Sequence, residues 1–158
     1  MGGRGQPGRG RRGLGPAADV SKVAAAADCV RAGAVLVATN KDPMYPTERG
    51  FRPGAGSVVA AIEVASRTES RVTIGKPGPL LLEVGAGLVG ADLSRAVMIG
   101  DALTDVQAGK AVGARTVLML TGVTTRAIAD ALPEPERPTR VAEDGAALAA
   151  ILEELAGA

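Results

Sequence analysis

The chain has 158 residues, of which 46% are hydrophobic, so it is long enough for one domain with a core of Ala, Val, Leu and Ile. It contains no histidine and one cysteine, which excludes histidine-based triads, histidine metal sites and an internal disulfide. The net charge is +1, but residues 1–18 hold four arginines and no acid, and the remainder is mildly acidic, with no sign of a nucleic-acid-binding face.

Residues 1–18 consist mainly of Gly, Arg and Pro, a composition with almost nothing to bury, and we expect this tail to be disordered. Arg/Gly tails can bind RNA by charge, but four arginines without interleaved aromatic residues make this the weaker alternative. No apolar run is long enough to span a bilayer, and no apolar leader is evident, so we expect a cytoplasmic protein without a membrane span.

From Asp19 onward, helical and strand patterns alternate along the chain. The periodicity predicts helices that begin near residues 20, 56, 78, 104, 124 and 145, and buried strands over 34–38, 71–74, 96–99 and 115–120. Residues 39–54 are dense in Pro, Gly, Asn and Asp and predict a loop. The alternation predicts an α/β fold with a Rossmann-like parallel sheet and helices on both of its faces.

The stretch GAGLVG (85–90) matches the glycine fingerprint of dinucleotide-binding sites. A crossover helix requires at least about 10 residues, yet only ADLSR separates Gly90 from the strand that begins at Ala96. We therefore predict that residues 78–89 are themselves the helix and that Gly90 ends it.

Two predicted strands end in polar residues suited to phosphate and metal. Lys76 follows the strand over 71–74, and Asp101 follows the strand over 96–99, with Asp105 four residues later. If these strands are parallel neighbours, the three side chains open onto one edge of the sheet, where sites commonly form. A lysine could neutralise phosphate and two carboxylates could hold Mg²⁺, although Gly-Asp after a strand is also ordinary turn chemistry.

From about Ala32 to Leu155 the chain resembles haloacid-dehalogenase-like (HAD) phosphatases, in particular the p-nitrophenylphosphatase and phosphoglycolate-phosphatase branch. The matching segments, in order, are VATNKDPMYPTERGFRPGAGSVVAAIEVAS, TIGKPGP and AVMIGDALTDVQAGKAVGARTVLMLTGV. The resemblance implies that residues 19–70 are part of an α/β cap and that residues 71–158 are the C-terminal half of a HAD core.

The resemblance also implies roles for individual residues. Lys76 corresponds to the lysine that orients the nucleophile and the phosphate, and Asp101 and Asp105 correspond to the Mg²⁺-binding acids. The second acid usually lies one residue later than Asp105. Candidates for substrate contact, from the cap segment TNKD, are Thr39, Asn40 and Asp42. The implied substrate is a small phosphorylated metabolite.

The aspartate nucleophile of the family lies in a DxDG(T/V) segment, and the sequence contains none. We therefore expect a HAD-like phosphatase homologue that lacks the nucleophile motif and has weak or absent activity alone. The alternative is a non-catalytic fragment that binds metal or phosphate or pairs with another chain. A homo-oligomer is left open by the sequence.

Overall fold

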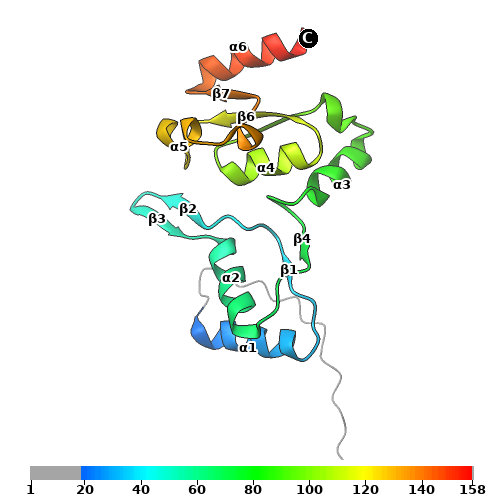
Figure 1. Ribbon diagram of the computed structural model, residues 1–158, viewed down its shortest axis with the longest axis vertical. Helices are drawn as coiled ribbons and strands as arrows, with labels where there is room; N and C mark the ends of the chain where they lie inside the picture. Colours follow the sequence, from blue (N-terminus) through cyan, green and yellow to red (C-terminus); the bar gives the residue numbers. More distant parts are fainter. Residues whose placement is uncertain (1–18, 158) are drawn as a thin grey trace, which may run out of the picture.

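The computed structural model describes residues 19–157. Figure 1 shows the elements in two groups, α1 to β4 in one and α3 to α6 in the other. The first group contains α1 (Val20–Arg31), β1 (Val37–Ala38), β2 (Met44–Thr47), β3 (Gly50–Pro53), α2 (Ala55–Ser66) and β4 (Val72–Thr73). The second contains α3 (Leu80–Val89), η1 (Leu93–Arg95), β5 (Val97–Gly100), α4 (Leu103–Ala111), β6 (Arg115–Met119), α5 (Arg126–Asp130), η2 (Glu134–Glu136), β7 (Arg140–Ala142) and α6 (Gly145–Ala156).

The second group is built on a parallel sheet with the strand order β5-β6-β7. Leu118 of β6 packs on one face with Val106 of α4 and Ala129 of α5. Val117 points to the other face, where α6 covers it with Leu155. Neighbouring residues of β6 thus serve opposite layers, because successive side chains of a strand point to opposite faces. The predicted α/β fold with a parallel sheet and helices on both faces is confirmed.

The first group has its own sheet, in which β1 and β4 pair in parallel with Val37 opposite Val72. Helices α1 and α2 pack against each other in this group, and Ala27, Val30 and Ile62 are buried. The assumption that the strand before Lys76 and the strand before Asp101 are neighbours in one sheet is wrong, because β4 pairs with β1 and β5 with β6. The two strands are connected through α3 rather than through a shared ladder.

The prediction of a loop over residues 39–54 is wrong in part, since β2 and β3 form an antiparallel hairpin there. Pro46 lies opposite Phe51, and Pro53 lies opposite Met44. Proline is excluded from the middle of a sheet because it lacks an N–H, but both strands of an isolated hairpin have a free edge where a missing donor costs little. The abundance of Pro and Gly therefore hid a short hairpin.

The prediction that the GAGLVG stretch is the end of a helix, made from the few residues before the next strand, is confirmed. Gly85 and Gly87 are inside α3, and Gly90 ends the helix in the left-handed conformation with φ of 66°. No helix of the described residues is long and apolar enough to cross a membrane. The expectation for residues 1–18 lies outside the described residues, and the boundary between a cap part and a core part near residue 70 stays a prediction.

Candidate active site

Lys76 is held at the end of β4 by backbone contacts with the segment that follows β1. The Gly75 N–H donates to Thr39 O over 2.9 Å, and the Lys41 N–H donates to Lys76 O over the same distance. These bonds continue the pairing of β1 with β4 past the ends of the strands. They fix the backbone from which the lysine side chain leaves, so its reach toward the second group is set by the fold.

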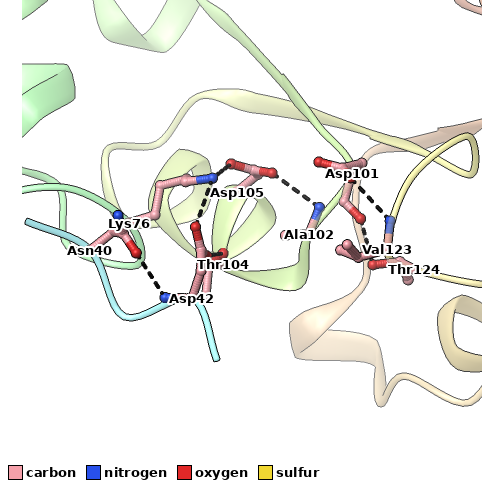
Figure 2. Close-up of polar contacts among 9 residues, drawn as sticks. All are labelled: Asn40, Asp42, Lys76, Asp101, Ala102, Thr104, Asp105, Val123 and Thr124. Atoms are coloured by element: carbon pink, nitrogen blue, oxygen red, sulfur yellow. Dashed lines mark hydrogen bonds and ion pairs between the residues drawn. The ribbon is translucent and has the colours of Figure 1, made fainter. Parts of the chain in front are cut away.

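The Lys76 ammonium group lies between two carboxylates from different parts of the chain (Figure 2). Its Nζ is 2.8 Å from Asp105 Oδ1 and 3.3 Å from Asp42 Oδ2. Burial of Lys76 works against its positive charge, but the hydrogen bond and charge of Asp105, with a further contribution from Asp42, outweigh this and raise the pKa of Lys76 above its ordinary value. Lys76 is therefore a fixed cation at neutral pH.

Asp105 lies in the first turn of α4, where a negative charge is favoured by the helix dipole. Its Oδ2 accepts a hydrogen bond of 3.0 Å from the N–H of Ala102, the residue before the helix. The residue is only 4% exposed. Both carboxylate oxygens thus have partners, one from the backbone just before α4 and the other from the Lys76 side chain across the two groups.

Asp101 follows β5 and is enclosed by the loop after β6. The Val123 N–H donates to Asp101 Oδ2 over 3.0 Å, and the Thr124 hydroxyl donates to Asp101 O over 2.6 Å. A Cβ added to Gly122 would lie 1.7 Å from Asp101 Oδ2, so only glycine allows this approach. The Oδ1 atom of Asp101 has no hydrogen bond to the described residues.

The three residues proposed for substrate contact have different surroundings. Asp42 reaches the site, since it pairs with Lys76 and accepts a hydrogen bond from the Thr104 hydroxyl. Asn40 Oδ1 accepts the Asp42 N–H over 3.1 Å, which uses the side chain to shape the turn. Thr39 contributes its backbone oxygen to Gly75. The structure thus brings Lys76, Asp42 and Asp105 together and places Asn40 and Thr39 behind them.

Sequence reasoning missed the residues that orient this site. Thr104 joins α4 to Asp42, and Gly122, Val123 and Thr124 fix Asp101. The one local signal is the Thr121-Gly122 pair after β6, which is typical of a turn but gives no indication of what the turn encloses. These contacts join residues 22 to 62 positions apart, and no local period encodes them.

One carboxylate of this site, that of Asp101, fits a hard divalent cation. Asp101 offers a carboxylate oxygen without another partner, and Mg²⁺ uses one or two protein carboxylates and takes water and phosphate oxygens for the rest. Asp105 could join as a second ligand only by giving up Lys76 or the Ala102 N–H. Within residues 19–157, no cluster of three or more Asp, Glu, His or Cys side chains is arranged to hold a metal ion.

The chain is similar in sequence to known hydrolases and phosphatases. Residues 73–148 match the HAD-hydrolase-like family. The chain is 41% identical over 125 residues to D-glycerol 3-phosphate phosphatase of Mycobacterium tuberculosis, a match that covers 78% of this chain and 35% of that protein.

Solved structures show the same relation. The 4-nitrophenylphosphatase of Thermotoga maritima superposes with a TM-score of 0.75 at 32% identity, covering 85% of this chain and 51% of that one. The glycerol phosphate phosphatase of M. tuberculosis, solved in complex with magnesium, superposes with a TM-score of 0.73 at 39% identity. The superposition covers 86% of this chain and 41% of that one. The chain thus spans 35% to 51% of the length of these three relatives.

Proposed function

Since this chain is a homologue of the HAD-like phosphatases, with residues 73–148 matching the family, we propose that it provides the Mg²⁺- and phosphate-binding part of a phosphatase acting on a small phosphorylated metabolite. The observation that carries the proposal is the convergence of Lys76, Asp42 and Asp105 from segments of the chain that share no sheet. Lys76 follows β4 and Asp105 lies in the first turn of the helix after β5, and ligands of open α/β folds bind outside the carboxyl ends of the strands.

In the proposed reaction, Lys76 binds the phosphate group and stabilises the negative charge that develops on it. Its ion pair with Asp105 orients the ammonium group, and a phosphate that enters would take the place of Asp42 beside Lys76. Asp101 would be the first ligand of Mg²⁺, and Asp105 the second if it is released from Lys76. When bound, Mg²⁺ supplies a further positive charge against the phosphate oxygens.

Asp42 is the residue of the TNKD segment best placed to meet the substrate, because its carboxylate lies beside Lys76. Asn40 and Thr39 hold the turn from which Asp42 projects. We assign Asp42 to the substrate side and Asn40 to positioning. A negatively charged residue beside the phosphate site favours substrates with a hydroxyl group that can donate a hydrogen bond to it.

The sequence contains no DxDG(T/V) segment, and we propose that the chain alone has weak or absent phosphatase activity while it retains ligand binding. The test is calorimetry of Mg²⁺ and of inorganic phosphate together with Mg²⁺-dependent turnover of p-nitrophenyl phosphate. We expect Asp101→Asn to abolish Mg²⁺ binding and Lys76→Met to abolish phosphate binding. Robust turnover that Asp101→Asn removes would contradict the proposed inactivity, and unchanged binding in both variants would contradict the site.

A non-catalytic interaction role remains the second candidate, and one observation favours it. Helix α3 contains no buried residue, although nearly all of its side chains are apolar. A surface of this kind is typical of a place where another polypeptide packs.

A further inference from the structure

The carboxylate of Asp42 is engaged on both of its oxygens, although the residue lies in the segment over 39–43 that connects β1 to β2. Its Oδ2 lies 3.3 Å from Lys76 Nζ, and its Oδ1 accepts a hydrogen bond from the Thr104 hydroxyl (Figure 2). Only 24% of the Asp42 side chain is exposed. Aspartate side chains are mostly exposed in proteins, so the position of this one requires that the segment over 39–43 is held in place by other parts of the chain.

The first turn of α2 holds the backbone of this segment. The Gly56 N–H donates to Asp42 O over 2.9 Å, and the Ser57 hydroxyl donates to Pro43 O over 2.6 Å. A Cβ on Gly56 would lie 2.3 Å from Lys41 O and 2.9 Å from Asp42 O. Glycine is therefore required at this position, because any larger residue displaces the peptide group that carries Asp42.

A second contact with the same segment lies about two turns further along α2. The Oε1 atom of Glu63 accepts hydrogen bonds from Lys41 Nζ over 3.0 Å and from the Ser70 N–H over 2.8 Å. Lys41 directly precedes Asp42, and its own N–H donates to Lys76 O over 2.9 Å. Glu63 thus ties the residue before Asp42 to the same helix that holds the Asp42 carbonyl oxygen.

We propose that α2, through Gly56 and Glu63, positions the Asp42 carboxylate against Lys76 as an internal competitor of the phosphate group. The inference rests on the proposed function, because it takes Lys76 as the phosphate-binding cation. A phosphate group that approaches Lys76 meets the negative charge of Asp42 at the same ammonium group, and like charges at this distance repel. The hold of α2 on the segment over 39–43 therefore sets the affinity for phosphate. Gly56 and Glu63 are positioning residues that act through Asp42.

The test is calorimetry of inorganic phosphate with the full chain. Asp42→Asn should tighten phosphate binding by about fivefold, because it removes the competing charge. Lys41→Met and Glu63→Gln should each tighten it by about twofold, because either change loosens the hold on Asp42. These two changes alter the net charge in opposite directions, so a shared increase cannot be a long-range effect of charge. Glu143→Gln is the matched control, since it also removes one acid from an ion pair, with Arg126 at 2.7 Å, and should change the affinity by less than about 1.5-fold.

Gly56→Ala tests the first turn of α2 without any change of charge. The new Cβ displaces the peptide group of Asp42, so phosphate should bind about twofold more tightly even though the fold is destabilised. A purely structural role of Gly56 predicts the opposite sign, since general damage to the site weakens binding. Gly87→Ala is the matched control, because a Cβ at Gly87 in α3 would meet nothing within 4 Å.

The inference is overturned if Asp42→Asn does not tighten phosphate binding. It is equally overturned if Asp42→Asn does so while Gly56→Ala and Lys41→Met leave the affinity unchanged or lower it, and the proposed function then stands without it. An increase in Glu63→Gln alone overturns it as well, because that result reflects charge rather than position. If neither the unmodified protein nor Asp42→Asn binds phosphate, the proposed function fails and this inference fails with it. The two failures thus give different results.

Discussion

Gly100→Ala is expected to destabilise the protein and to disturb the candidate site. A Cβ on Gly100 would lie 2.2 Å from both Cγ and Oδ2 of Asp105 and 2.4 Å from its Cβ. Asp105 cannot give way cheaply, because Lys76 holds one of its oxygens at 2.8 Å and the Ala102 N–H holds the other at 3.0 Å. Either β5 moves relative to α4, or Asp105 loses its partners.

The magnitude can be bounded from these two outcomes. Overpacking a buried position costs about 1–3 kcal/mol, and loss of a hydrogen bond to a buried charged group costs about 1.5–3 kcal/mol. The two costs do not add in full, because a displacement of Asp105 that breaks its hydrogen bonds also relieves the overlap with the new Cβ. We expect the free energy of unfolding to fall by about 2–4 kcal/mol, and the affinity for phosphate to fall as Lys76 loses its orienting partner.

The measurement is urea unfolding followed by circular dichroism, with Gly85→Ala as the matched control. Gly85 is inside α3, and a Cβ there would meet nothing within 4 Å. Gly85→Ala should raise the free energy of unfolding by about 0.5–1 kcal/mol through helix propensity alone. If Gly100→Ala unfolds within about 0.5 kcal/mol of the unmodified protein, the close approach of β5 to Asp105 does not hold the site together, and the reasoning fails.

Two further predictions concern other carboxylates. The hydrogen bond from Ser70, together with Lys41 Nζ at 3.0 Å, lowers the pKa of Glu63 from 4.5 to about 2. The ionised Glu63 carboxylate therefore contributes its full share of stability above pH 4.5, and this share is lost as the pH falls toward 2. Urea midpoints measured between pH 5 and 2 should fall more steeply for the unmodified protein than for Glu63→Gln, and parallel curves would refute this. Gly122→Ala, whose Cβ would lie 1.7 Å from Asp101 Oδ2, should weaken Mg²⁺ binding by about tenfold in calorimetry, and an unchanged affinity would show that the loop does not orient Asp101.

Sequence reasoning succeeded where the signal is local. The helix over 78–89 and its end at Gly90 followed from a count of residues, and α3 runs over Leu80–Val89 with Gly90 in the left-handed conformation. Two strands of the three-stranded sheet, β5 and β6, were visible as apolar runs, and in β6 this reflects the cover on both faces. The third strand, β7 (Arg140–Ala142), was not predicted, because it is only three residues long and begins with an arginine. The hairpin over Met44–Pro53 was missed because proline was taken as a strand breaker, which holds inside a sheet but not at a free edge.

The sequence by itself determined the α/β alternation and marked Lys76, Asp101 and Asp105 as the residues with chemistry to offer. Only the tertiary structure decided that Lys76 pairs with Asp105 and Asp42, while Asp101 is enclosed by the loop over 122–124 and has one carboxylate oxygen without a partner among the described residues. The physical reason is that a helix or strand is specified by the period of its own side chains. The contact between Lys76 after β4 and Asp105 of α4 joins parts of the chain that belong to different sheets. It depends on the course of the chain between them, which no periodic pattern of side chains encodes.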